Sequence, residues 1–220
     1  MITPDSEKAF WNGEEIVDYF SSKEADPRVL NTISDQSTDA TNVALDLGCG
    51  GGRHTVALAE AGYKVLAVDI NPAMLMMTAR KLGTRRHEVI LSYGYLGALP
   101  SPDNTFDLVV STGVIHQARS AENMNAAIAD VARTMKPQGV FVGNMFVNDV
   151  WDNTYTTPNP FRPEFIETRE GLGMSLVSAG EATDMFVNNG FELLSAPIVD
   201  FKQENTGPRG VFRFLGKLDK

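Results

Sequence analysis

A glycine-rich loop between an apolar segment and an alanine-rich segment is the feature that most constrains the fold of this chain. The segment Val43–Thr55 reads VALDLGCGGGRHT, and its apolar start ends in Asp46 just before the glycines. Because glycine lacks a Cβ atom, such a loop can turn sharply and let a ligand lie against its backbone. The helix expected behind the loop offers unpaired N–H groups and a positive dipole end, which suit an anion. The pattern therefore predicts a strand, a ligand-binding loop and a helix in direct succession.

Short apolar segments alternate with helical ones up to residue 147. Strands joined by helices pair in parallel through right-handed crossovers. The alternation predicts an α/β fold with a doubly wound, mostly parallel seven-stranded sheet, helices on both faces and an antiparallel last strand. In such a sheet the ligand lies beyond the carboxyl ends of the strands. We expect strands at residues 43–46, 63–69, 88–93, 106–112 and 140–147, with helices at 55–61, at 72–82 behind an Asn71 cap, and behind a Ser120 cap.

The pattern predicts one domain over residues 1–220, in four parts. Residues 1–40 are expected to be helical, and residues 43–147 to form the ligand-binding core. Residues 148–177 lack periodicity, as is typical of an insertion, and their aromatic residues are Trp151, Tyr155, Phe161 and Phe165. Residues 178–220 hold the last helix and strand pair: a capping box of Ser178 and Glu181, a helix that stops at Gly190, and antiparallel segments at 191–201 and 210–218.

Charge and cysteine content exclude several classes of partner. The formal net charge is −9, and the 19 basic residues are dispersed rather than gathered, which argues against nucleic acid or an anionic membrane as a partner. The single cysteine, Cys49, rules out an internal disulfide and a cysteine metal cluster, and suits a reducing cytosol. The N-terminus is too polar for a signal peptide, and no apolar run reaches the ~18–20 residues of a membrane span. We expect a cytoplasmic protein without a metal site.

Two common phosphate-binding loops do not match. A dinucleotide fingerprint needs G-x-G-x-x-G, and Arg53 stands at the place of its third glycine. The long Arg53 side chain would also point into the space that a pyrophosphate occupies. A Walker loop is excluded because no Gly-Lys-Ser/Thr follows the glycines.

Four segments, in order and at suitable spacing, resemble class I S-adenosylmethionine-dependent methyltransferases of the small-molecule type. LDLGCGGGRHT is similar to their first motif, and VLAVDINPAML to the second-strand motif with its ribose-binding acid. ALPSPDNTFDLVVSTGVIHQ resembles the stretch through the fourth strand, and VARTMKPQGVFV the helix and turn before the fifth. That turn is usually Pro-Gly-Gly, whereas this chain has Gln138 at the middle position. The resemblance implies S-adenosylmethionine as methyl donor and S-adenosylhomocysteine as product.

The resemblance also implies which residues hold the cofactor. Asp69 ends the second strand, where its carboxylate can accept hydrogen bonds from both ribose hydroxyls. As a helix cap it would be redundant, because Asn71 already fills that role. Other residues expected around the cofactor are Gly48, Cys49, Gly50 and Gly52 in the loop, and Thr112 at the end of the fourth strand.

Adenine recognition departs from the family pattern. Ile70 and Met74 offer an apolar floor for the ring. Relatives often carry an acidic residue after the third strand, where this chain has Tyr95. Tyr95 could stack or hydrogen-bond instead, while the backbone N–H of Leu96 contacts the ring edge.

Three loop residues have competing interpretations. Asp46 is expected to orient the loop and to reach the cofactor's ammonium only indirectly. Arg53 either pairs with the methionyl carboxylate or is a solvent-exposed residue of the first helical turn. Cys49 is interpreted as a small loop filler and not as a nucleophile.

Methyl transfer needs little catalytic machinery from the protein. It is an in-line displacement, and positioning alone can lower the barrier by ~7–11 kcal/mol. His116, just past the fourth strand, is the candidate general base and would titrate near ~6.5, its alternative role being to hold the loop. Tyr19 is the second candidate, because residues 1–40 resemble the N-terminal lid of small-molecule members. Residues 148–177 follow the fifth strand, where the resemblance implies a substrate cap. His54 is interpreted as structural and His87 as a surface residue.

Exclusion leaves a small organic acceptor. The fourth strand continues into Thr112-Gly113-Val114, without the Asn/Asp-Pro-Pro-Tyr pattern of amino-methylating nucleic-acid enzymes. A non-catalytic cofactor-binding module or partner subunit is the alternative from another class. An aminopropyl transferase and a nicotinamide-dependent reductase are weaker alternatives. The sequence does not indicate the oligomeric state.

Overall fold

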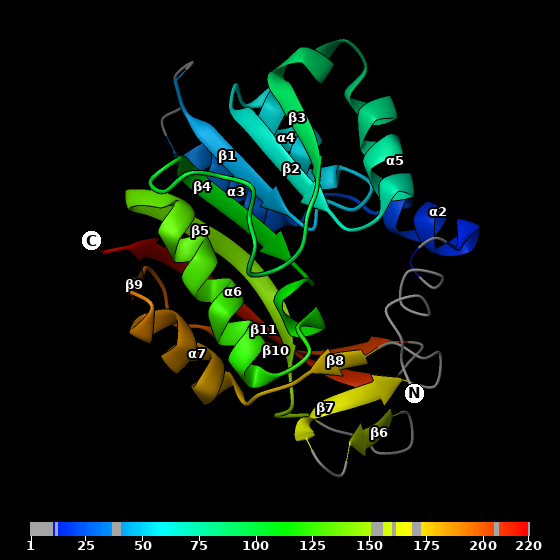
Figure 1. Ribbon diagram of the computed structural model, residues 1–220, viewed down its shortest axis with the longest axis vertical. Helices are drawn as coiled ribbons and strands as arrows, with labels where there is room; N and C mark the ends of the chain where they lie inside the picture. The colour runs from blue at the N-terminus through cyan, green and yellow to red at the C-terminus, as the bar shows by residue number, and fades with distance from the viewer. Residues whose placement is uncertain are drawn as a thin grey trace.

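The computed structural model describes a sheet with helices on both faces (Figure 1). Helices α6 (Ala121–Thr134) and α7 (Ala179–Asn188) cover one face, and α3 (Pro27–Asp35) and α4 (Arg53–Glu60) the other. Helices α2 (Glu14–Ser22) and α5 (Pro72–Leu82) lie beside each other at one end. The structure describes residues 11, 13–36, 41–150, 156–159, 162–168, 173–204 and 207–219.

The main sheet confirms the predicted doubly wound topology. Its strands run in the order β10-β11-β5-β4-β1-β2-β3, with the short β9 paired to β11. All pairs from β5 to β3 are parallel, and β11 pairs antiparallel with β5, β9 and β10. The strands are β1 (Val43–Leu47), β2 (Lys64–Asp69), β3 (Val89–Tyr93), β4 (Phe106–Thr112), β5 (Met135–Val147), β9 (Phe191–Leu193), β10 (Ile198–Glu204) and β11 (Gly207–Leu218).

The expected single strand over residues 191–201 is instead two strands. Leu194–Pro197 interrupts it, so that β9 and β10 pair with different parts of β11. Pro197 has no backbone N–H to donate to a ladder, which favours a break at this point.

Helices α5, α6 and α7 begin directly after the capping residues that the sequence predicts. Asn71 Oδ1 accepts a 2.8 Å hydrogen bond from the N–H of Ala73, and Ser120 Oγ one of 3.1 Å from Asn123. The Ser178–Glu181 capping box is present in both directions. Two short 3₁₀ segments, η1 (Gly83–Glu88) and η2 (Ile115–Gln117), complete the helical elements of the described chain.

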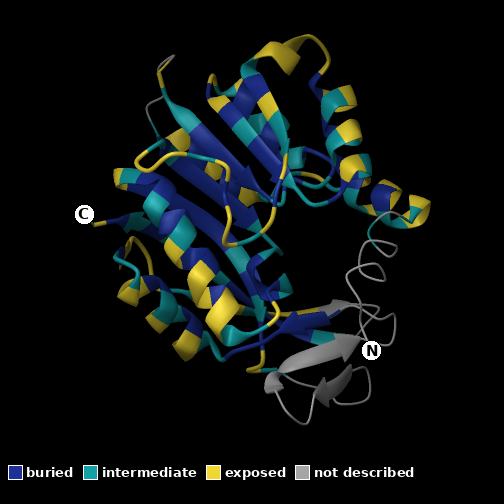
Figure 2. Ribbon diagram, in the orientation of Figure 1, coloured by how far each residue is buried: buried dark blue, intermediate teal, exposed yellow. Residues whose placement is uncertain are grey.

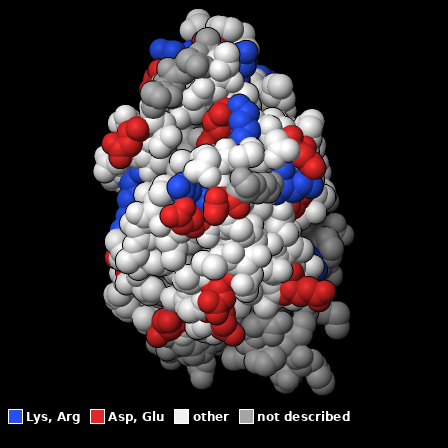
Figure 3. Space-filling model, turned by 90° about the vertical axis from the view of Figure 1, so that its left-hand side faces the viewer, with Lys and Arg blue, Asp and Glu red and all other residues white. Residues whose placement is uncertain are grey.

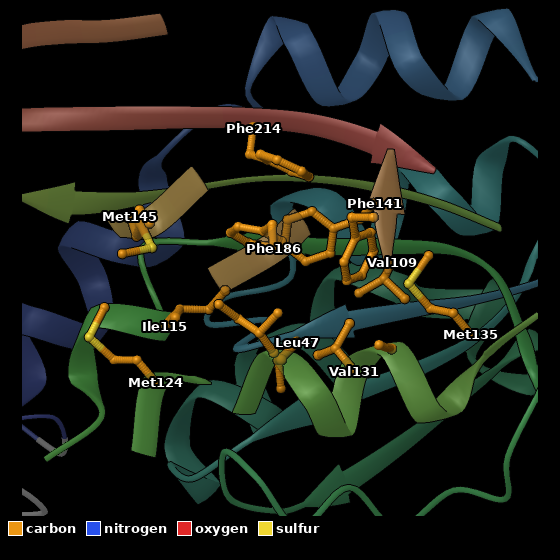
Figure 4. Packing of buried hydrophobic residues seen from close by; sticks show 14 of the residues in the cluster. Leu47, Val109, Ile115, Met124, Val131, Met135, Phe141, Met145, Phe186 and Phe214 are labelled. Atoms are coloured by element: carbon orange, nitrogen blue, oxygen red, sulfur yellow. The ribbon is translucent and has the colours of Figure 1, made fainter. Parts of the chain in front are cut away.

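The core under α6 and α7 follows the predicted helical stripe. Met124, Ile128, Val131 and Met135 are at most 1% exposed. Figure 4 shows this stripe facing a cluster of aromatic rings from other elements. Phe186 of α7 stacks on Phe214 of β11 with ring centroids 4.0 Å apart, and Phe141 of β5 packs against both. Figure 2 shows the sheet as largely buried, with exposed residues on the outward sides of the helices.

The segment expected to be an aperiodic insertion contains a second, three-stranded antiparallel sheet. It consists of β6 (Thr156–Asn159), β7 (Arg162–Thr168) and β8 (Gly173–Ser175). Pro158 and Pro163 lie within the first two of these strands, and proline usually signals a strand break. A 3.0 Å hydrogen bond from the N–H of Asn148 to the carbonyl of Val177 closes the base of the insertion. Of its four aromatic residues, Trp151, Tyr155 and Phe161 lie outside the described residues, and Phe165 belongs to β7.

Acidic and basic side chains are interspersed on the face shown in Figure 3, in keeping with their dispersion in the sequence. Within the described residues, no helix combines the length and apolar character needed to cross a bilayer.

We predict opposite stability effects at the irregular start of β5, where its pairing with β4 shifts register. Gln138 has a φ of 62°, which costs a side-chain-bearing residue about 1–2 kcal/mol. A Cβ atom on Gly139 would lie 3.0 Å from the carbonyl oxygens of Lys136 and Phe106. Gln138→Gly should raise the free energy of unfolding by up to ~1 kcal/mol, since glycine loses part of the gain to backbone entropy. Gly139→Ala should lower it. Urea unfolding of both variants measures this, and a larger loss in Gln138→Gly than in Gly139→Ala would contradict it.

Candidate functional site

The glycine loop lies at the carboxyl ends of β1 and β2, the edge where this architecture binds ligands. The backbone N–H groups of Gly48 and Cys49 both donate to the carbonyl of Val68, at 2.8 and 3.0 Å. The loop is thus held on the end of β2. Gly52 then caps α4 with a φ of 82°.

Two loop glycines serve different needs. Gly48 has a φ of 69°, and a Cβ atom there would collide with the side chain of Val114. Gly50 has a φ of 53° and nothing within 4 Å of the position of its missing Cβ. Gly48 is therefore required by the protein itself, whereas Gly50 leaves open space in which a ligand can approach the backbone.

Asp69 joins the glycine loop to the start of α5. Its Oδ2 accepts a 2.8 Å hydrogen bond from the N–H of Gly50, and its Oδ1 one of 2.8 Å from the N–H of Asn71. Burial raises the pKa of Asp69, and these backbone hydrogen bonds oppose the rise. The side chain is only half-buried, and a carboxylate has about four lone-pair sites, so acceptor capacity remains.

Asp46 and Cys49 are both buried and turned into the protein. Asp46 Oδ2 accepts a 2.6 Å hydrogen bond from Thr55 Oγ1, which ties β1 to α4, and burial raises its pKa to about 6. Cys49 Sγ lies 4.0 Å from Thr78 Oγ1. Burial, with the negative charges of Asp46 and Asp69, raises the pKa of the Cys49 thiol well above its usual range. Both side chains have structural contacts, in line with the loop-orienting and loop-filling interpretations.

A polar network lies beside the loop. Arg53 donates to Thr112 Oγ1 and to the carbonyl of Glu24, each at 3.3 Å. His54 Nε2 accepts a 3.1 Å hydrogen bond from the N–H of Asp26, and its Nδ1 lies 3.5 Å from Thr112 Oγ1. Burial, then the charge of Arg53, lowers the pKa of His54 to about 3. The segment that joins α2 to α3 is therefore attached directly to the first turn of α4.

The residues expected around adenine are only partly suited to that role. Met74 is 3% exposed and packs in the interior, which leaves Ile70, half-buried, as the member of that pair with free surface. Tyr95 is 50% exposed, and its ring meets that of Tyr93 edge-on with centroids 5.2 Å apart. Leu96 follows, half-buried. An aromatic pair thus stands where relatives often carry an acid.

His116 is held inside the protein. It is 1% exposed, its Nδ1 accepts a 3.1 Å hydrogen bond from the N–H of Phe146, and the two rings lie 4.4 Å apart. Burial, then the positive charge of Arg209, lowers its pKa to about 3. This low pKa does not fit the expected titration near 6.5. These contacts favour the role of a loop support, the alternative interpretation of this residue.

Tyr19 lies on the outer side of α2. It is 50% exposed, its ring packs edge-on against Phe20, and Lys23 Nζ is 4.2 Å from its centroid. Ser21, two residues on, is buried against Gly51. Residues two apart point to different sides of a helix, so Tyr19 is not brought together with the glycine loop.

The contacts of the N-terminal segment with α4 and with α5 and its cap are not predicted by the sequence pattern. Asn71, besides capping α5, donates from its side chain to the carbonyl of Trp11, and Lys81 donates to that of Ser21. The sequence signal that could have revealed the approach of α2 is Gly51, a glycine that neither the turn of the loop nor the glycine motif requires.

A cavity of about 230 Å³ lies between α3 and the strands β5 and β11. It is smaller than the ~300–1,000 Å³ of most pockets for drug-sized ligands, and no glycine-loop residue lines it. Its lining includes Asp26, Arg28, Thr112, Asn144 and Arg213. The cavity shares Thr112 with the network around Arg53.

Comparisons with known proteins agree with this geometry. Residues 45–143 match a family described as "Methyltransferase domain". A demethylmenaquinone methyltransferase of Tropheryma whipplei is 33% identical over 98 residues, which are 44% of this chain and 39% of the relative. An uncharacterised methyltransferase of Anoxybacillus flavithermus is 26% identical over 87% of this chain and 86% of its own length.

A solved structure shows the same fold. An S-adenosylmethionine-dependent methyltransferase from Methanosarcina mazei superposes with a TM-score of 0.67 and 18% identity, over 90% of this chain and all of that one. The chain spans about two fifths of the length of the demethylmenaquinone relative.

We predict that the two buried histidines make the fold acid-sensitive. The pKa values of His54 and His116 are about 3 in the folded protein, against 6.5 for an ordinary exposed imidazole. Between these limits the unfolded chain binds more protons, so stability is lost as the pH falls from 6.5 towards 3. Asp46, with its raised pKa of about 6, opposes part of this loss because it takes up its proton in the folded state.

Urea unfolding between pH 7 and pH 4 measures the slope. The double variant His54→Gln/His116→Gln should show a flatter dependence than the wild type. His87→Gln, whose side chain is 76% exposed, is the matched control and should leave the slope unchanged. A slope that is equal in all three proteins would contradict the assignment.

Proposed function

We propose that this chain is a class I S-adenosylmethionine-dependent methyltransferase and that it transfers a methyl group from that cofactor to a small organic acceptor. The observation that carries the proposal is the position of Asp69. Its carboxylate adjoins Gly50, the loop residue with open space beside it, and keeps acceptor capacity for ribose hydroxyls.

The residues present fit the parts of this cofactor. Asp69 would hold the ribose, and the open backbone at Gly50 would lie against the adenosine or the methionyl arm. Ile70 and the Tyr93–Tyr95 pair would contact adenine. Arg53, at the N-terminus of α4, would face the carboxylate of the methionyl arm together with the positive end of the helix dipole.

The bound cofactor supplies a methyl group that its sulfonium already activates. What the chain contributes is position: it holds the acceptor in line with the methyl group and excludes water, which can lower a barrier by ~7–11 kcal/mol. With a pKa of about 3, His116 is neutral at neutral pH and a weak base. We therefore propose that it supports the loop behind β4 and does not act as a general base.

The acceptor is proposed to be a small organic molecule. The Tropheryma whipplei relative is named for demethylmenaquinone, and its match to this chain is confined to 98 residues. The acceptor side of such enzymes is built from the segments outside the cofactor core, here α2 and the β6–β8 insertion. Those are the segments in which this chain is expected to define its own substrate.

Cofactor binding tests the proposal directly. S-Adenosylhomocysteine at 100 times its Kd should stabilise the protein by about 2.7 kcal/mol, whereas NAD should not. Differential scanning fluorimetry with both ligands measures this. A shift with NAD alone would overturn the assignment of the cofactor.

A pair of substitutions at Asp69 separates binding from folding. Asp69→Asn keeps a side-chain oxygen for one backbone N–H, whereas Asp69→Ala leaves Gly50 and Asn71 without this partner. Both variants should bind S-adenosylhomocysteine at least tenfold more weakly, since hydrogen bonds to charged groups are worth ~1.5–3 kcal/mol. Only Asp69→Ala should also lose marked stability. Unchanged affinity by calorimetry in a folded Asp69→Asn protein would contradict the role of Asp69.

The pH profile of kcat tests the role of His116 once an acceptor is known. His116→Gln keeps an acceptor for the N–H of Phe146, so we expect a change in thermal stability and the same pH profile as in the wild type. The opposite result is a wild-type kcat that rises with pH around ~6.5, a variant that lacks this rise, and a variant kcat that is ~10²-fold lower. It would show that His116 acts as the general base.

A further inference from the structure

We propose that Ser21, on the lid helix α2, binds the carboxylate of the cofactor's methionyl arm, with Arg53 and Lys81 supplying positive charge around it. The inference rests on the proposed function and deepens it. It assigns to α2 the binding of the carboxylate end of the cofactor.

The Ser21 hydroxyl is buried without a partner. The residue is 7% exposed, and its Oγ has no hydrogen-bond partner among the described residues. A hydroxyl can both donate and accept, and leaving a buried one unpaired costs free energy. An unpaired buried hydroxyl therefore needs an explanation. A ligand that forms the missing hydrogen bond provides such an explanation.

The hydroxyl is directed at the glycine loop. A Cβ atom on Gly51 would collide with Ser21 Oγ and would lie 2.6 Å from Ser21 Cα. Gly51 does not have a positive φ, so its backbone conformation does not require glycine. The close approach of α2 to the loop is what requires glycine at this position. Gly51 thus brings Ser21 to the turn just before the N-terminus of α4.

Two cations reach the same end of α2. Lys81 Nζ donates to the carbonyl of Ser21, and Arg53 Nη1 to that of Glu24 at 3.3 Å. The pKa of Lys81 is lowered by burial of its ammonium and by the positive charge of Arg53. Among the described residues, no carboxylate forms an ion pair with either cation. Both are engaged by neutral oxygens, and an anion placed between them would relieve their repulsion.

A carboxylate suits this group of donors. Charge-assisted hydrogen bonds from a hydroxyl, a guanidinium and an ammonium are stronger than neutral ones. The N-terminus of α4 adds a positive dipole end. S-Adenosylhomocysteine carries a carboxylate on its amino-acid arm, whereas 5′-methylthioadenosine has the same nucleoside part without that arm. The two ligands therefore separate recognition of the carboxylate from recognition of adenosine.

The test is a calorimetric comparison of these two ligands. Ser21→Ala should bind S-adenosylhomocysteine about tenfold more weakly and 5′-methylthioadenosine with unchanged affinity. Without ligand the variant should be at least as stable as the wild type, because it removes an unpaired buried hydroxyl. Ser22→Ala is the matched control: its hydroxyl is exposed and donates to the carbonyl of Tyr19 at 2.9 Å, so both affinities should stay as in the wild type.

Gly51→Ala is a second, independent variant. Its methyl group should push α2 off the loop, so that S-adenosylhomocysteine again loses affinity and 5′-methylthioadenosine does not. Equal loss of both ligands in Ser21→Ala, or no loss of either, would overturn the inference and leave the proposed function intact. If the wild type binds neither ligand, the proposed function itself fails.

Discussion

Two hydrogen bonds accepted by the Asp69 carboxylate organise the ligand edge of the sheet. One comes from the backbone N–H of Gly50 and the other from that of Asn71, so that a single side chain joins the loop behind β1 to the helix behind β2. Asn71 in turn caps α5 and reaches the carbonyl of Trp11. The position of the loop, the start of α5 and the approach of the N-terminal segment all depend on this carboxylate.

The N-terminal segment is attached at a second place by a different chemistry. Neutral His54 accepts from the backbone of Asp26, and Arg53 reaches the carbonyl of Glu24. Asp26 also pairs with Arg213 of β11 at 3.1 Å. The link between α2 and α3 therefore contacts both the first turn of α4 and strand β11.

The fold of residues 43–147 could be predicted because its signals are local. The glycine loop, the Asn71 and Ser120 caps and the apolar stripe of α6 each depend on residues close together in the chain. The break at Pro197 escaped prediction because the apolar pattern of residues 191–201 outweighed the local proline signal. The strands around Pro158 and Pro163 escaped it because pairing partners, not local propensity, decide them. The orientations of His116 and Tyr19 could not be predicted for a related reason. A sequence position behind a strand or on a lid does not tell which way the side chain turns, and here one turns inward and the other outward.

The closed base of the β6–β8 insertion has an evolutionary consequence. Asn148 and Val177 stand next to each other across a backbone hydrogen bond, and the N–H of Ala179 donates to Asp149 Oδ2 at 2.8 Å. The chain thus leaves β5 and returns to α7 at nearly the same point. Segments between such anchors can be exchanged, lengthened or shortened while the sheet keeps its register, because the entropy of closing a loop grows only slowly with its length. A scaffold of this kind lets the insertion diversify by recombination at one junction while the main sheet and its glycine loop are inherited unchanged.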